Sequence, residues 1–159
     1  MYVNARAIIE RGNGEETEVL LQVAARPDTP PSLEFPGGRL EEFEPILDAL
    51  RREVFEETGL RVTHVLGSPN QTLAESVDAA VEFLTPFCAY QTVRGPVDSI
   101  GCFFRCHAEG ELLHEGDAAY GHRWVRVNDL EQELARSPEQ FHWLTQGALR
   151  FYLQWRRTQ

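Results

Sequence analysis

Two stretches rich in apolar residues near the start of the chain, separated by a polar, glycine-containing segment, predict a pair of antiparallel strands. They cover residues 2–10 (YVNARAIIE) and 17–26 (TEVLLQVAAR), and the intervening segment 11–16 (RGNGEE) has the composition of a hairpin loop. Residues 27–32 (PDTPPS) form a loop rich in chain breakers, and a short strand follows over residues 33–38 (LEFPGG). The first quarter of the chain is therefore predicted to be mainly sheet.

Apolar residues at helical spacing predict the first helix of the chain. It is expected to begin near Pro45, which is acceptable at the first helical position, and to run to Thr58, with Gly59 as the stop signal. The residues of its buried stripe are Ile46, Leu50 and Val54. The helix is thus expected to pack one face against a sheet.

The rest of the chain is predicted to alternate between strands and helices. Strands are predicted over residues 60–68, 81–93, 98–108 and 122–127. Asn128 is expected to cap a short helix over residues 129–134, and Ser137 with Pro138 to open a last helix over residues 138–157. The apolar residues of that last helix, expected to make core or homodimer contacts, are Phe141, Leu144, Ala148, Phe151 and Trp155. This order favours an α/β fold, a mixed sheet covered by helices on both sides, and a single domain over residues 1–159.

The charge of the chain limits what it is expected to bind. The chain of 159 residues has 25 acidic and 15 basic residues and a net charge of -10. This balance disfavours tight binding to a nucleic acid polymer, which needs clustered cations, and suggests that a phosphate substrate arrives with a metal cation. All the basic residues are arginines, so a lysine Schiff base and a P-loop lysine are excluded.

Cysteine usage and hydropathy predict a cytoplasmic protein. Cys88, Cys102 and Cys106 are odd in number and lack metal-type C-x-x-C spacing, which favours free thiols in a reducing compartment. The segment MYVNARAIIERG lacks the basic-then-apolar layout of a signal peptide, and no apolar run reaches membrane-span length. We therefore expect no membrane partner.

The last turns of the first predicted helix carry acids where the helix dipole repels them. Counted at about 100° per residue from Ile46, Glu53 and Glu57 fall within about 20° of the buried stripe, and Glu56 lies on its flank. A buried carboxylate without compensation is costly, and a cluster of them requires raised pKa values or a cation. Oxygen ligands of this kind suit Mg²⁺ or Mn²⁺, whereas the alternative interpretation is a solvated charged face.

The segment over residues 38–60 resembles the Nudix box. The residues that match it, without a mismatch, are Gly38, Glu44, Arg52, Glu53, Val54, Glu56, Glu57, Gly59 and Leu60. The resemblance implies a Nudix-type α/β/α sandwich with a mixed sheet. It also implies metal-dependent hydrolysis of a nucleoside diphosphate linked to another group, a small nucleotide-type substrate. A Nudix-fold sensor that binds a metabolite without efficient catalysis is the alternative.

The resemblance also implies roles for individual residues. Glu53 and Glu57 would be the main ligands of Mg²⁺ or Mn²⁺, with a carbonyl of Gly37 or Gly38, and Glu56 would bind the ion or activate water. Arg52 would hold a carboxylate, that of Glu44, unless the two form only a surface ion pair. On the substrate side, Arg39 and Phe35 are the expected contacts. The acids proposed as an alternative general base, unless solvent exposure is their only role, are Glu109, Glu111, Glu115 and Asp117.

Three residues depart from common Nudix usage. Phe43 occupies a loop position where glycine is frequent, and Leu33 stands where an aromatic residue often precedes the Pro-Gly-Gly sequence. Gly121 occupies a place where many members have a glutamate, which weakens that route to a general base. The sequence does not identify the substrate beyond its class.

Overall fold

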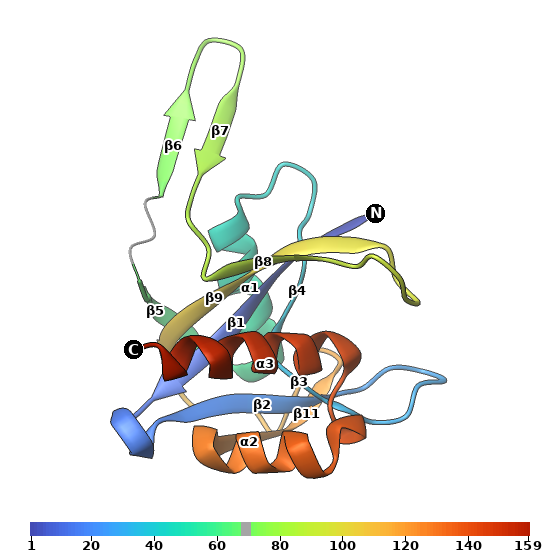
Figure 1. The fold of residues 1–159 in the computed structure, drawn as a ribbon. Coiled ribbons are helices and arrows are strands. Elements are labelled where there is room, and N and C mark those ends of the chain that lie inside the picture. Colours follow the sequence, from blue (N-terminus) through green and yellow to red (C-terminus); the bar gives the residue numbers. More distant parts are fainter. Residues whose placement is uncertain (68–70) are drawn as a thin grey trace.

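A curled mixed sheet forms the centre of the molecule in the computed structural model, which describes residues 1–67 and 71–159 (Figure 1). Its strand order is β10-β11-β2-β1-β9-β5, and β3, β4 and β8 pair with β2, β1 and β9 respectively. The pairing of β1 with β9 is parallel and the other pairings are antiparallel, so the predicted mixed sheet is confirmed.

The elements have the following bounds. The strands are β1 (Tyr2–Arg11), β2 (Glu18–Ala24), β3 (Leu33–Glu34), β4 (Gly37–Arg39), β5 (Arg61–Val65), β6 (Thr72–Glu75), β7 (Ala80–Phe83), β8 (Cys88–Gln91), β9 (Ser99–Glu109), β10 (Glu115–Gly116) and β11 (Ala119–Arg126). The helices are α1 (Ile46–Thr58), α2 (Val127–Arg136) and α3 (Trp143–Arg157), with 3-10 turns η1 (Gly14–Glu16) and η2 (Pro138–Gln140). Within the described residues, no helix is long and apolar enough to cross a membrane.

Helices cover both faces of the sheet, as the α/β/α prediction requires. Successive residues of β1 point to opposite faces, so Ile8 packs in the cluster beneath α2 and α3, whereas Ile9 packs in the cluster beneath α1. Figure 1 shows α2 and α3 on one side of the sheet and α1 on the other. The middle of β1 is therefore buried on both faces, which explains the apolar run Ala7-Ile8-Ile9.

The structure differs from the prediction at several boundaries in the second half of the chain. The predicted strand over 81–93 is interrupted, because β7 ends at Phe83 and β8 begins at Cys88, with Pro86 between them. Helix α2 begins at Val127 after Arg126, so the prediction that Asn128 caps this helix was wrong. The side chain of Val127 is buried, and its N–H donates to the carbonyl of Thr17. Both contacts hold the start of α2 at this residue.

The last helix begins five residues later than predicted. Residues 138–140 form the separate turn η2, and Phe141 bridges to Leu33 of β3 in an extended conformation. The N–H of His142 donates to the carbonyl of Leu33, and His142 then caps α3 by accepting from the N–H of Leu144. Pairing with the sheet thus overrides the helical pattern before Trp143.

Strands β6 and β7 form a separate hairpin that projects from the body of the molecule (Figure 1). The predicted strand over 60–68 is seen as β5, but its last residue, Ser68, lies outside the described residues. Glu82 of β7 accepts a 2.7 Å hydrogen bond from the N–H of Ile46, the first residue of α1. Since Pro45 supplies no side-chain cap, this contact satisfies an amide that the helix itself leaves unpaired.

Candidate functional site

Two glycines of β4 create the space in which the acidic residues of α1 lie. A Cβ on Gly38 would come within 2.6 Å of the carboxyl carbon of Glu53. A Cβ on Gly37, whose φ is 141°, would come within 2.4 Å of the carbonyl oxygen of Ala5. The N–H of Gly37 donates to Glu57 Oε1 over 2.7 Å. The Gly-Gly pair therefore lets β4 approach β1 and α1 at once.

Arg52 binds several carboxylates from within the predicted motif. Its Nε and Nη2 donate to the two oxygens of Glu44 over 2.7 and 2.9 Å, and its Nη1 donates to Glu53 Oε1 over 2.9 Å. Nη1 also lies 3.3 Å from Glu56 Oε2, and Nη2 donates to the carbonyl of Arg39. The predicted contact between Arg52 and Glu44 is thus present as a bidentate pair, which lowers the pKa of Glu44 and raises that of Arg52.

The two acids nearest the sheet are unusually hard to ionise. Burial, assisted by the negative charges of Glu34 and Glu53, raises the pKa of Glu57 to about 8, although the N–H of Gly37 and the charge of Arg6 oppose the shift. Burial also raises the pKa of Glu53, although the hydrogen bond from Arg52 opposes this. Glu57 is 7% exposed, so an added positive charge at this position would be needed to keep it ionised at neutral pH.

The loop between β9 and β11 covers the C-terminal end of α1. The N–H of Leu113 donates to the carbonyl of Thr58, and the N–H of Asp117 donates to that of Glu56. These bonds satisfy carbonyls that the helix end leaves unpaired. The alternative bases predicted from sequence are carried by this loop or its edges, and all have exposed side chains: Glu109, Glu111, Glu115 and Asp117.

The carboxylates near β4 supply oxygen ligands, which are the type that a hard divalent cation prefers. Within residues 1–67 and 71–159, no group of three His, Cys, Asp or Glu side chains is arranged to hold a metal ion as it stands. Arg52 instead binds the oxygens of Glu53 and Glu56. However, burial raises the pKa values of Glu53 and Glu57, and the positive charge of a divalent cation would favour the ionised form of both.

A basic cavity lies on the α3 side of β1, next to these acids. It has a volume of about 460 Å³, and its lining includes Arg6, Arg26 and Arg39. Arg6 lies opposite Gly37 in the pairing of β1 with β4, and Gly37 bonds to Glu57, so the cavity adjoins the acidic cluster. The side chain of Arg6 is 11% exposed, and its Nε has no hydrogen-bond partner among the described residues. Its Nη1 lies 3.7 Å from Glu34 Oε2, so a buried carboxylate balances part of the charge of this arginine.

The cavity includes one of the two predicted substrate contacts and excludes the other. The guanidinium of Arg39 lies 3.4 Å from the centre of the Tyr2 ring at the cavity wall. Phe35 is fully buried, and its ring packs edge to face against Phe103 in the core. The prediction that Phe35 contacts substrate through its ring is therefore not supported, because the ring has no exposed face.

Sequence reasoning missed Arg6 and Arg26. Arg6 lies between two alanines in the first strand, where a charged residue reads as part of a solvated sheet face. In the structure its Nη1 donates to the carbonyl of Phe35, and Glu34 binds Arg26 over 2.9 Å. In the sequence, the only indication of a role for Arg6 is its charge, because a charged residue is rare in the middle of a buried strand.

Comparisons with known proteins agree with this architecture. The NUDIX domain family matches residues 1–146. A MutT NUDIX hydrolase from Burkholderia pseudomallei has a similar structure, with 21% identity over 94% of this chain and 95% of that chain and a TM-score of 0.64. A NUDIX hydrolase from Nitrosomonas europaea is 19% identical over 95% of this chain and 87% of that chain, with a TM-score of 0.60. No match was found among curated proteins.

Proposed function

The chain belongs to the NUDIX domain family, and on this premise we propose that it hydrolyses the pyrophosphate linkage of a nucleoside diphosphate joined to another group. The observation that carries the proposal is the juxtaposition of an acidic cluster and a basic cavity. Glu57 bonds to Gly37 of β4, and Arg6 opposite Gly37 lines the cavity. Arginines on one side of β4 and carboxylates on the other suit a substrate that carries both negatively charged phosphates and a bound metal ion.

We assign the metal-binding role to the buried acids of α1. Glu53 and Glu57, with Glu56 and the carbonyl of Gly38, would hold Mg²⁺ or Mn²⁺. Such a cation, when bound, neutralises phosphate oxygens and makes water easier to deprotonate. Arg52 would position Glu44 and Glu53, since it bonds to both.

Proton transfer is assigned to Glu56. Its side chain is 40% exposed, whereas that of Glu53 is 17% exposed and Glu57 is buried. Glu56 is therefore the acid of the cluster that an attacking water reaches most easily, and Arg52 Nη1 fixes one of its oxygens. Arg6, Arg26 and Arg39 would bind the phosphate oxygens of the substrate and orient the linkage toward α1.

We further propose that residues 1–159 form one domain and act in the cytoplasm. Helix α3 extends past the family match to Arg157, but Leu149, Tyr152 and Leu153 of this helix are buried in the same core as β1 and β2. The cysteines of the chain are all free, which agrees with a reducing compartment.

One observation favours a second candidate, a Nudix-fold protein that binds a nucleotide without efficient hydrolysis. Arg52 occupies carboxylate oxygens that a catalytic cation would share, and the described acids form no ready ligand set. A binding protein of this kind would bind substrate and leave it intact.

Product release across a panel of nucleoside diphosphate derivatives separates the two candidates. Hydrolysis of at least one substrate should require Mg²⁺ or Mn²⁺, stop in EDTA and fall by about a hundredfold or more in Glu57→Gln. Glu75→Gln, on the exposed β6 strand, is the matched control and should retain activity. Hydrolysis by pure protein that EDTA does not inhibit would exclude the proposed mechanism. Binding of a nucleotide without hydrolysis would favour the second candidate.

A further inference from the structure

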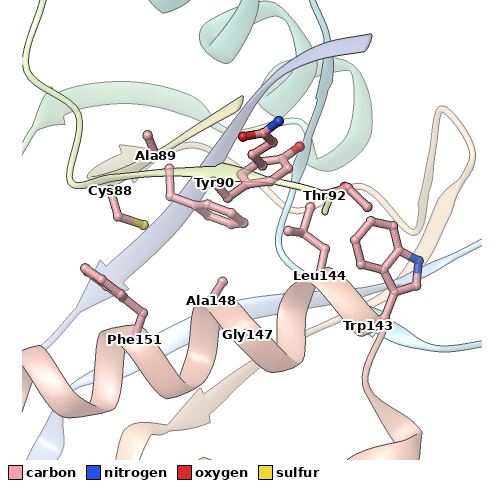
Figure 2. Close-up of a pocket in the computed structure, with 11 residues that line it drawn as sticks. Cys88, Ala89, Tyr90, Thr92, Trp143, Leu144, Gly147, Ala148 and Phe151 are labelled. Carbon is pink, nitrogen blue, oxygen red and sulfur yellow. The ribbon is translucent and has the colours of Figure 1, made fainter. Parts of the chain in front are cut away.

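A second cavity opens between β8 and α3, beside the basic cavity. It has a volume of about 250 Å³. The two cavities are neighbours that share part of their walls, namely Tyr90, Trp143 and Leu144. Figure 2 shows β8 running over α3, with Leu144, Ala148 and Phe151 pointing toward the strand and Cys88 pointing toward the helix. We call this space the β8–α3 chamber.

The walls of the chamber are mostly aromatic and aliphatic. Trp143 and Phe151, at its two ends, are 38% and 51% exposed, and the ring of Phe103 lies 5.7 Å from that of Tyr90. Large apolar side chains that stay exposed around a concave space are typical of a ligand site. The chamber therefore suits a flat, largely apolar group that can contact ring faces.

Gly147 keeps the chamber open. It lies inside α3, where glycine destabilises a helix relative to alanine. A Cβ at this position would meet no atom of residues 1–67 or 71–159 within 4 Å, so no described neighbour requires glycine there. Because a larger residue would be tolerated by the helix and would enter free space, the absence of a side chain leaves room for something else.

Few polar side chains of the chamber are free to read the edge of a ligand. The hydroxyl of Tyr90 accepts a 2.9 Å hydrogen bond from Asn4, and the hydroxyl of Thr92 is 3.0 Å from that of Ser99. The remaining side-chain N–H donors are the amide of Gln91, which is exposed, and the indole N–H of Trp143 at one end of the chamber. Stacking on aromatic side chains tolerates every nucleobase, whereas discrimination needs hydrogen bonds to the base edge.

These observations deepen the proposed function and rest on it. We propose that the β8–α3 chamber holds the nucleobase of the substrate while the arginines of the basic cavity hold its phosphates. We also propose that bases are accepted with similar affinity, because they are held by stacking and not by their hydrogen-bonding edges. Gly147 is then the residue whose missing side chain leaves room for the base, whichever base it is.

The test measures binding without metal and without turnover, so it is independent of whether the protein hydrolyses its ligand. Isothermal titration with AMP, GMP, CMP and UMP should give Kd values within about threefold of one another, and ribose 5-phosphate should bind about tenfold more weakly or worse. Gly147→Leu should weaken the four nucleotides to the level of ribose 5-phosphate and leave the Kd of ribose 5-phosphate unchanged. Gln154→Leu, exposed on the same helix, is the control and should behave as wild type.

Several results would overturn the proposal. They are equal affinity for AMP and ribose 5-phosphate, undetectable binding of every nucleotide, or one base bound far more tightly than the others. Unchanged nucleotide affinity in Gly147→Leu, or an equal loss of affinity for ribose 5-phosphate, would show that the base does not bind in the chamber. Gly147→Ala, which should melt higher than wild type, checks that the helix tolerates substitution. Failure of hydrolysis alone would contradict the proposed function and leave these binding results intact.

Discussion

At the scale of single residues, Phe43 has a conformation that its side chain disfavours. Its φ is 60° and its ring is 97% exposed, so no packing offsets the backbone strain. Phe43→Gly should therefore raise the free energy of unfolding by roughly 0.5–1 kcal/mol, or about 1–4 °C in melting temperature. Phe43→Ala, which removes the ring but keeps a Cβ, is the control. An equal gain from alanine would mean that the ring, and not the backbone, was the source of the strain.

The acid Glu57 predicts a pH dependence with a defined sign. Its pKa is raised from 4.5 to about 8 by burial, so between these values the folded protein binds more protons than the unfolded chain. Without metal, stability should be greatest at the acidic end of this window and fall as the pH rises toward 8. Thermal melts in EDTA between pH 5 and 8 should show this slope in wild type and a smaller one in Glu57→Gln. Parallel slopes in the two proteins would mean that Glu57 ionises normally.

At the scale of the elements, the β6–β7 hairpin supports the helix that carries the acids. Glu82 accepts the N–H of Ile46, and loss of a helix cap costs about 1 kcal/mol. Glu82→Ala should lower the melting temperature by about 2–4 °C and speed hydrogen exchange in the first turn of α1. Glu75→Ala lies on the same hairpin with its side chain exposed and should have little effect. An equal loss of melting temperature in both variants would mean that the effect comes from the hairpin in general and not from the bond between Glu82 and Ile46.

At the scale of the whole molecule, metal binding and stability should be linked. In EDTA, the double change Glu53→Gln and Glu57→Gln should melt higher than wild type, because it removes two acids from a buried site that opposes their charge. Mg²⁺ at about a hundredfold over its Kd should stabilise wild type by about 2.7 kcal/mol and leave the variant unchanged. If the variant melts lower in EDTA, these glutamates support the fold through contacts such as that of Glu57 with Gly37.

The fold was predictable where local spacing and burial agree. The stripe of Leu50 and Val54 and the stop at Gly59 gave α1 almost to the residue. The prediction failed where a distant partner decides the conformation. Phe141 and His142 belong to a helical pattern, but pairing with Leu33 holds them extended. No residue within ten positions of Phe141 indicates its pairing with Leu33.

The sequence by itself determined the acidic face of α1, because the 3.6-residue period places Glu53 and Glu57 in line with the apolar stripe wherever the helix lies. It also determined the family, because the spacing of the motif is a property of the chain. Only the tertiary structure decided that burial raises the pKa of Glu57, and that Arg6, Arg26 and Arg39 face one cavity. It also decided that a chamber opens between β8 and α3, more than fifty residues apart. Such contacts join segments whose meeting depends on the packing of the whole sheet, and a local pattern carries no information about it.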